Sequence, residues 1–391
     1  MLGIGLASLF SDLSHETASA LLPAWLATLG VEAAWLGIIE GVSDGLASFA
    51  KLASGHLTDR LARRKKIAVF GYLVTALGTA SFGFARTAWH VLAARSFAWL
   101  GRGVRTPIRK ALLAGSVTRE TYGRAFGFER MMDTLGAIAG PAAAFFLLRL
   151  LHGDYPRLFA LTAIPGLLAV LSITFLVQEK ARARVAAIAF GESLRQMPRA
   201  YRRFLVSVFA FGLGDFAHTL LILLAVQKLT PALGAVRAAA ASMGLYILHN
   251  TIDAAGAITT GWLADRWNKR RLLQCGYLLA ASMALAIVFL PPSLSSFAVI
   301  FALAGAAKAV VETAEDSLCA ELVEASHHGM AFGVLATANG VGDFVSSILV
   351  GALWSAVGTM VAFGTSAAFF LCGAAFLVRM KDPPAATSVA D

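Results

Sequence analysis

Acidic residues and histidines stand at helical spacing within apolar stretches of this sequence. Asp12 and His15 are three residues apart, with Glu16 beside His15, and Asp215 and His218 repeat that spacing. A separation of three residues places two side chains on one face of a helix. Ionisable groups are costly to bury in apolar surroundings, so they usually face a partner or an aqueous cavity. Four more residues lie at similar depth in their apolar stretches: Asp44, Asp133, His249 and Asp343.

Three interpretations of these residues stay open. Carboxylates beside histidines would form a proton relay or bind substrate in a central cavity, because an imidazole titrates near neutral pH. Carboxylates and imidazoles also suit a divalent transition metal. The candidate metal ligands are Asp12, His15, Asp215 and His218, joined by His249 and Asp253. Alternatively, neighbouring charges neutralise one another, as Arg130 and Asp133 would at helical spacing. We expect Lys51 and Glu129, near the ends of their helices, to extend toward the membrane surface.

The composition indicates a helical membrane protein. Of 391 residues, 58% are hydrophobic and 14% are charged, against roughly 25% charged in an average soluble domain. Apolar runs of about 20 residues recur along the chain, and each is long enough to cross a bilayer as a helix. We expect twelve such helices, near 2–29, 32–57, 66–85, 88–112, 124–151, 157–177, 203–229, 237–263, 271–290, 296–317, 329–356 and 359–378.

Three phrases occur twice in the same order. "GHLTDRLARRKK" begins at Gly55 and returns as "GWLADRWNKRR" at Gly261, 206 residues later (261 − 55). "GRAFGF" at residues 123–128 returns as "GMAFGV" at 329–334, and "DLSHET" at 12–17 has a counterpart, "DFAHTL", at 215–220. The halves are therefore structural repeats, and an even number of spans in each gives them the same orientation. This predicts a six-helix bundle at 1–178, a cytoplasmic linker with a possible interfacial helix at 179–202, a second bundle at 203–380 and a tail at 381–391.

Lysine and arginine set the expected orientation. About 24 of the 33 basic residues fall at loops or helix ends on one side of the predicted topology, together with both copies of the basic phrase. By the positive-inside rule that side is the cytoplasm, which also holds both termini. The anionic inner leaflet accounts for the net charge of +10 without a nucleic acid. We therefore expect a multi-pass protein of the cell membrane.

The basic phrase resembles the signature of the major facilitator superfamily, G-x-L-x-D-R-x-x-R-R-K, between the second and third helices. The copy at Gly261 resembles the weaker echo between the eighth and ninth helices. The resemblance implies a gating role on one side of an alternating-access cycle. Physically, glycine lets helices approach closely, and the aspartate can accept hydrogen bonds from a helix N-terminus. The gating residues it implies are Gly55, Asp59, Arg60, Arg64, Gly261, Asp265, Arg266 and Arg270.

Two further motifs resemble parts of the same family. In the fifth helix, Gly127, Gly136 and Gly140-Pro141 are similar to the antiporter motif, although Ala144-Phe145 replaces its final glycine pair. Ordinary packing of small residues is the alternative interpretation. In the fourth helix, Arg95 is similar in position to an arginine of many proton-coupled members.

The matched ends of the fourth and tenth helices carry opposite charges. Arg105, Arg109 and Lys110 align with a segment that contains Glu312, Glu315 and Asp316. We expect salt bridges between these segments to close the cytoplasmic side, with a solvated acidic loop as the alternative.

These patterns predict a secondary transporter rather than an enzyme. We expect proton-coupled export of an amphipathic or cationic compound by a monomer that contacts small-molecule substrate, protons and lipids. A metal or metal-chelate exporter is the alternative, and a non-transporting receptor or scaffold is the alternative of another class. Few Asn and Gln are available for a sugar. No nucleotide-binding loop follows a strand, so no cofactor is expected.

Overall fold

The computed structural model describes residues 1–29, 33–59, 61, 63–179, 192, 195 and 197–380, and among these all regular structure is helical. The predicted gating residue Arg60, most of the linker at 179–202 and the tail at 381–391 lie outside the described residues. The chain forms two compact units. Unit 1 is Met1–Ala187 with Asp253–Trp262 and Ala325–Thr337, and unit 2 is the remainder.

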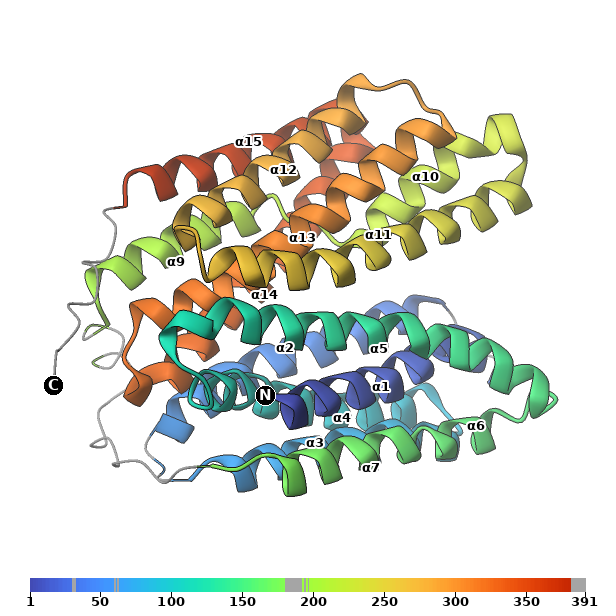
Figure 1. Cartoon of the computed structure of the whole chain (residues 1–391). Coiled ribbons are helices and arrows are strands. Elements are labelled where there is room, and N and C mark those ends of the chain that lie inside the picture. The colour runs from blue at the N-terminus through green and yellow to red at the C-terminus, as the bar shows by residue number, and fades with distance from the viewer. Residues whose placement is uncertain are drawn as a thin grey trace, which may run out of the picture. The chain divides into compact units, whose positions relative to one another are not determined.

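Unit 1 contains the first six predicted helices. In Figure 1, α1, α5, α3 and α7 run alongside one another, and α1 contacts both α5 and α7. The elements are α1 (Leu2–Thr28), α2 (Ala33–Asp59), α3 (Lys65–Ala80), η1 (Ser81–Phe84), α4 (Ala88–Ala114), η2 (Arg119–Thr121), α5 (Tyr122–Leu150), α6 (Tyr155–Leu161), α7 (Ala163–Leu171) and η3 (Ser172–Leu176).

Unit 2 contains most of the remaining helices. They are α9 (Arg199–Gly212), α10 (His218–Leu233), α11 (Ala235–Ala264), α12 (Lys269–Phe289), α13 (Leu294–Leu322), α14 (His328–Ala356) and α15 (Thr359–Val378), with η4 (Ala325–His327) before α14. Two helices are shared, because part of α11 and the first turns of α14 belong to unit 1.

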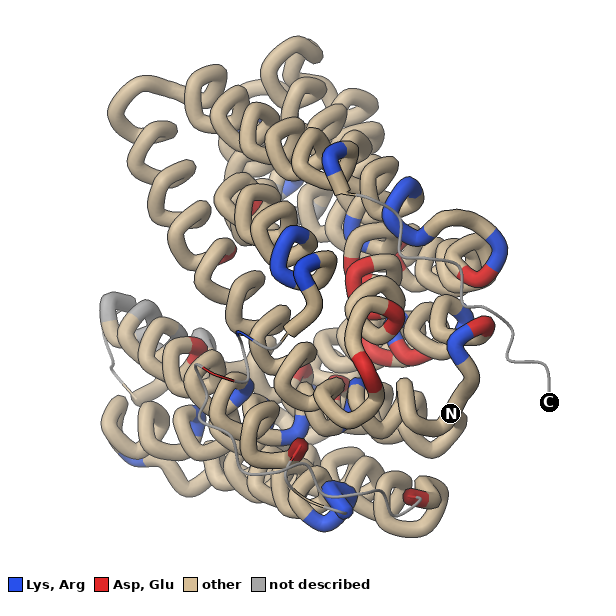
Figure 2. The backbone as a smooth tube through the Cα atoms, turned by 90° about the vertical axis from the view of Figure 1, so that its left-hand side faces the viewer, with Lys and Arg blue, Asp and Glu red and all other residues tan. Residues whose placement is uncertain are grey.

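The helices are long and apolar enough for a membrane protein. Seven segments of the described chain satisfy both criteria, the longest being Arg119–Leu150 and Ala325–Ala356. Most of the backbone tube in Figure 2 belongs to uncharged residues, with acidic and basic positions scattered along it. These helices agree with the prediction of a polytopic helical protein.

The predicted helix at 203–229 is wrong in one respect, because it is interrupted. Residues 213–217 are not helical, and they separate α9 from α10. Two glycines flank Leu213, and glycine disfavours a helix interior by about 1 kcal/mol. A Cβ on Gly214 would lie 2.7 Å from the Ser366 carbonyl oxygen, so this backbone packs closely on α15. The Ala217 N–H, freed by the break, donates to Ser347 Oγ at 3.0 Å.

The predicted helix at 157–177 is also segmented. It forms α6 and α7, joined at Thr162, and it ends in a π-helical turn at Ser172–Leu176. Pro165 lies in the first turn of α7, where a missing N–H is tolerated. The Thr162 carbonyl accepts a hydrogen bond from Ser14 Oγ at 2.8 Å, so the junction is attached to α1.

The residue that leads into the central linker is attached to α3. The Glu179 carboxylate accepts hydrogen bonds from the backbone N–H groups of Arg64 (2.7 Å) and Lys65 (3.0 Å). A carboxylate in this place satisfies N–H groups that have no partner within the helix. Burial raises the pKa of the Glu179 carboxyl, and the hydrogen bond from Lys65 opposes that shift.

Close packing of α1 on α5 gives a stability prediction. A Cβ on Gly136 would lie 2.5 Å from the Leu9 carbonyl oxygen, so Gly136→Ala must push the two helices apart. We expect a loss of about 1–3 kcal/mol, as for overpacked cores, seen as a lower melting temperature in detergent. Gly45→Ala on α2 is the matched control, because nothing lies within 4 Å of its Cβ. An equal effect of both substitutions would contradict this packing.

Candidate functional site

Several buried charges of unit 1 gather around α4. Arg109 is the centre of one group: its Nη2 lies 2.8 Å from Glu129 Oε1, and its Nη1 lies 3.1 Å from Asp133 Oδ1. Ser8 Oγ joins them, accepting from Arg109 Nη1 at 2.7 Å and donating to Glu129 Oε1 at 2.9 Å. Glu129 is buried rather than extended toward the membrane surface, so that expectation was wrong. Its partner on α4 is what compensates the burial.

His15 is the centre of a second group. It is 1% exposed and its Nδ1 lies 2.9 Å from the Ser11 carbonyl oxygen. A carbonyl can only accept, so Nδ1 carries the hydrogen and Nε2 is the nitrogen whose protonation can change. Nε2 lies 3.2 Å from Glu16 Oε1 but makes no hydrogen bond of acceptable geometry. The Asp12 carboxylate lies 3.5 Å from Nδ1 and 3.9 Å from Arg105 Nη2.

Trp99 links this second group to α2. Its ring meets His15 edge-on at 5.7 Å between centroids, and its Nε1–H donates to Asp44 Oδ1 at 2.7 Å. The Arg95 guanidinium lies 4.1 Å above the same ring. Arg95 therefore makes a cation–π contact with the residue that also contacts His15 and Asp44. Trp99 was not predicted as a site residue, because a tryptophan in an apolar helix gives no signal of its partners.

Asp59 binds the start of α14. Its two carboxylate oxygens accept hydrogen bonds from the N–H groups of Gly329 (2.9 Å) and Met330 (2.6 Å). This is an anion at a helix N-terminus, where free N–H groups and the helix dipole both favour negative charge. Arg64 Nη1 lies 3.7 Å from the same carboxylate. A Cβ on Gly55 would fall within contact distance of the Gly329 carbonyl oxygen, so glycine is required there.

Asp253 binds α11 to α5 in unit 1. Its carboxylate lies 2.6 Å from Arg130 Nη2 and accepts from Thr134 Oγ1 at 3.3 Å. Arg130 also pairs with Asp133, at 3.8 Å, as the spacing predicts, but the shorter contact is the one to α11. A Cβ on Gly127 would collide with the Ala257 carbonyl, so close approach to α11 needs a glycine here.

The other glycines of the predicted motif in α5 face α1. Gly136 and Gly140 pack against Leu9 and Glu16, and Pro141 lies inside the helix. The glycines of this motif therefore pack on two helices: Gly127 packs against α11, and Gly136 and Gly140 pack against α1.

In unit 2 the predicted residues divide between two places. Asp215 is exposed and lies in the break between α9 and α10, so Asp215 and His218 do not share a helical face as predicted. His218 stacks on Tyr246 (5.1 Å, 10°), and Tyr246 stacks on His249 (5.9 Å, 11°). These rings form a continuous column along α10 and α11.

Glu315 lies in the second place, on α13. It is 2% exposed, and its carboxylate accepts hydrogen bonds from Tyr277 Oη and Asn339 Nδ2, both at 2.9 Å. Sequence reasoning missed Tyr277 and Asn339, because nothing in their local sequence indicates a carboxylate partner. Glu312, three residues earlier, pairs with Lys308 at 3.9 Å.

The remaining predicted residues lie on other segments. Asp343 is exposed on α14. Asp265 and Arg266 lie in the turn after α11, and Arg270 is in the first turn of α12. The predicted salt bridges between the segments around Arg109 and Glu315 stay a prediction; within their own units, Arg109 pairs with Glu129 and Asp133.

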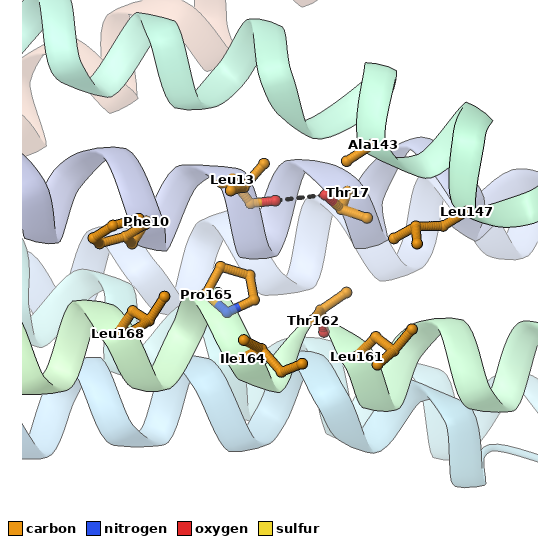
Figure 3. Close-up of a pocket in the computed structure, with 10 residues that line it drawn as sticks. All are labelled: Phe10, Leu13, Thr17, Ala143, Leu147, Leu161, Thr162, Ile164, Pro165 and Leu168. Carbon is orange, nitrogen blue, oxygen red and sulfur yellow. Dashed lines mark hydrogen bonds between the residues drawn. The ribbon is translucent and has the colours of Figure 1, made fainter.

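An apolar pocket of about 330 Å³ opens between α1, α5 and the α6–α7 junction. Figure 3 shows its walls, with Phe10 and Leu13 on one side and Ile164, Pro165 and Leu168 on the other. The hydroxyl of Thr17, at its edge, donates to the Leu13 carbonyl at 2.6 Å and lies 3.1 Å from the Gly140 carbonyl oxygen. The pocket therefore offers apolar contact rather than hydrogen bonds.

Within the described part of the chain, no three His, Cys, Asp or Glu side chains group as a metal site would require. The metal interpretation of Asp12, His15, Asp215 and His218 therefore gains no support from their placement.

Comparison with known sequences and structures identifies related transporters. A sequence model of the Major Facilitator Superfamily matches residues 4–248 and 204–391. An uncharacterized MFS-type transporter of Methanocaldococcus jannaschii is 25% identical over 90% of this chain and 87% of its own length. Multidrug resistance protein MdtH of Salmonella typhi is 24% identical over 80% of this chain and 77% of its own.

Solved structures show the same fold. The human organic anion transporter MFSD10 (TETRAN) matches with a TM-score of 0.80 at 17% identity, covering 96% of this chain and 98% of its own. The E. coli fucose:proton symporter FucP matches with a TM-score of 0.77 at 16% identity, covering 98% of each chain.

The Arg130–Asp253 contact gives a second stability prediction. Removing one partner leaves the other charge buried, which costs about 3–5 kcal/mol. We expect Arg130→Gln and Asp253→Asn each to lower the melting temperature, and the double variant to lose less than the sum of the two. The control is Arg157→Gln, which breaks a pair whose arginine is 78% exposed and should cost only ~0–1 kcal/mol. Strict additivity would show that the pair is not coupled.

Proposed function

Because this chain belongs to the Major Facilitator Superfamily of transporters, we propose that it exports an amphipathic or cationic compound in exchange for protons. The two six-helix bundles at 1–178 and 203–380 would alternate access around a central cavity, with the linker at 179–202, the tail at 381–391 and both termini in the cytoplasm. The protein would act as a monomer in the cell membrane.

The observation that carries this proposal is the arrangement of His15. Its Nδ1 is occupied by the Ser11 carbonyl, whereas Nε2 is buried 3.2 Å from Glu16 Oε1 without a hydrogen bond. A proton added at Nε2 would convert this contact into an ion pair with hydrogen-bonded character. The Glu16 side chain is 34% exposed, so it offers a path by which a proton can reach the buried ring.

We propose that a proton and a cationic substrate compete for the Asp12 carboxylate. Its arginine partner is distant, with Arg105 Nη2 at 3.9 Å, whereas Arg109 holds Glu129 at 2.8 Å. A weakly compensated carboxylate in apolar surroundings gains most from binding a proton or a cation. Proton binding would then displace a cationic substrate, which is the exchange that an antiporter requires.

Export is favoured by the relatives. Several are named multidrug resistance protein, and their sequences match over about three quarters of this chain or more. The apolar pocket beside α1 supports a substrate with an apolar part.

Asp59 and Asp253 would act as gates. Each carboxylate holds a shared helix, α14 or α11, to unit 1. Alternating access requires such contacts to break and re-form, and their energy sets the balance between states.

Transport in proteoliposomes tests the proposed function. With a lipophilic cation such as tetraphenylphosphonium as probe, we expect uptake driven by a pH gradient in the wild type. Asp12→Asn should reduce it at least ~10-fold, equivalent to about 1.4 kcal/mol. Glu324→Gln, at an exposed site after α13, is the charge-matched control and should retain full activity. Failure of the wild type to respond to a pH gradient with any tested solute would favour the receptor or scaffold alternative.

The gating role of Asp59 gives a separate prediction. Asp59→Asn keeps the size of the side chain but removes the charge that faces the Gly329 and Met330 N–H groups. We expect transport to fall by about an order of magnitude with folding retained, because the balance between states shifts. Glu324→Gln, at an exposed site after α13, is the charge-matched control and should retain transport. Equal losses in the two variants would argue against a specific role for the α14 contact.

A further inference from the structure

Glu315 is a buried carboxylate whose hydrogen-bond partners are neutral. Among the described residues, no Lys, Arg or His nitrogen lies within 4.0 Å of its oxygens, and its partners are Tyr277 Oη and Asn339 Nδ2. It lies seven residues before the C-terminal end of α13. At ~1.5 Å per residue this is about 10 Å from the helix end, within the expected hydrocarbon region of the membrane. An ionised carboxylate with no cation is costly in such surroundings.

The repeat supplies an internal comparison. The position matched to Glu315 in the first half is Arg109, by the same offset of 206 residues. Arg109 is held by two carboxylates and is therefore permanently compensated. The second half has a carboxylate at this position, and among the described residues no cation lies within 4.0 Å of it. Binding a proton would neutralise it.

The two partners of Glu315 can serve both of its protonation states. A tyrosine hydroxyl either donates or accepts, and an asparagine amide offers two donors on one atom and an acceptor on the other. When Glu315 is ionised, both partners donate to it, as observed. When it is protonated, its hydroxyl can donate to Asn339 Oδ1 after a rotation of the amide. An arginine partner would allow only the first of these states.

The other ionisable groups near Glu315 are mostly acidic. Asp316 and Glu312 on α13 act on it electrostatically. Asp215, in the break before α10, interacts with Lys308 and Glu312. Lys308 pairs with Glu312, and both side chains are more than one third exposed. On α12 the facing group is Tyr277, which stacks on Phe211 of α9 at 4.0 Å.

These acidic residues also provide a route for protons. Glu312 and Glu315 are three residues apart on one helix face. Glu312 is partly exposed and Asp215 is exposed. If Glu315 binds a proton, the partly exposed Glu312 is a candidate for passing it to the buried carboxylate. Asn339 is itself partly buried and lies two residues beyond the segment of α14 that belongs to unit 1.

We propose that Glu315, with Tyr277 and Asn339, is a proton-binding site of unit 2. When Glu315 binds a proton, it becomes the donor in its hydrogen bond with Asn339 instead of the acceptor. This changes the contact between α13 and α14. The same helix is attached at its first turn to Asp59, so proton occupancy at Glu315 and the contact at Asp59 act on one element. This role in coupling rests on the proposed proton-driven transport, whereas proton binding itself does not.

The test is a direct count of protons on the purified full-length protein. Infrared difference spectra between acidic and alkaline buffer record the carbonyl band of a protonated carboxylic acid. We expect Glu315→Gln to remove one such band and to reduce proton uptake by one per chain. Tyr277→Phe keeps the carboxyl but removes a donor to its ionised form, so it should move the midpoint of that band to higher pH. Glu324→Gln should leave the buried band unchanged.

The outcomes separate this inference from the proposed function. Loss of the band in Glu315→Gln supports the site even if proteoliposomes show no proton-driven transport. An unchanged band and unchanged proton uptake in Glu315→Gln would overturn the inference, even if transport through Asp12 is observed. If Glu315→Gln folds poorly, the shift in Tyr277→Phe decides the question, and an unmoved midpoint there would overturn it.

Discussion

A charge buried among apolar helices costs several kcal/mol unless an opposite charge or a set of hydrogen-bond donors faces it. In the described helices, most buried charges have such a partner on a neighbouring helix. Arg109 neutralises Glu129 and Asp133, Arg130 neutralises Asp253, and the N-terminus of α14 compensates Asp59. Each of these contacts joins two helices: α4 with α5, α5 with α11, and α2 with α14. The groups that compensate the buried charges therefore also hold pairs of helices together.

The two halves of the chain solve this problem differently. The first half places arginines on α4 opposite carboxylates on α1 and α5, which fixes the charges in pairs. The second half places Glu315 on the matched helix among a tyrosine and an asparagine, which satisfy it without fixing its charge. If Glu315 binds a proton as proposed, the duplicated fold holds ion pairs in one copy and a group of variable charge in the other.

Most of the fold could be predicted from the sequence because each apolar run is long enough to define its own helix. The break at 213–217 could not, since Gly212 and Gly214 fit a packed helix as well as an interrupted one, and only the contact of Gly214 with Ser366 distinguishes the two. The depth of Asp12 and His15 was predictable from their position. The partners of the buried charges were not predictable, since Ser8 and Glu129, for example, are 121 residues apart. The prediction for Glu129 was wrong because a position near a helix end does not reveal the buried Arg109 on the neighbouring helix.

The hydrogen bond from His15 Nδ1 to the Ser11 carbonyl restricts what this imidazole can do with a proton. Conduction through an imidazole requires the proton to enter at one nitrogen while another leaves from the second, with the ring then changing tautomer. Here the second nitrogen is committed to the backbone of its own helix. In the proposed exchange, His15 would accept and release a proton at Nε2 alone and would not pass one across the ring. The proposed exchange would therefore not leak protons through this ring while the hydrogen bond to Ser11 is intact.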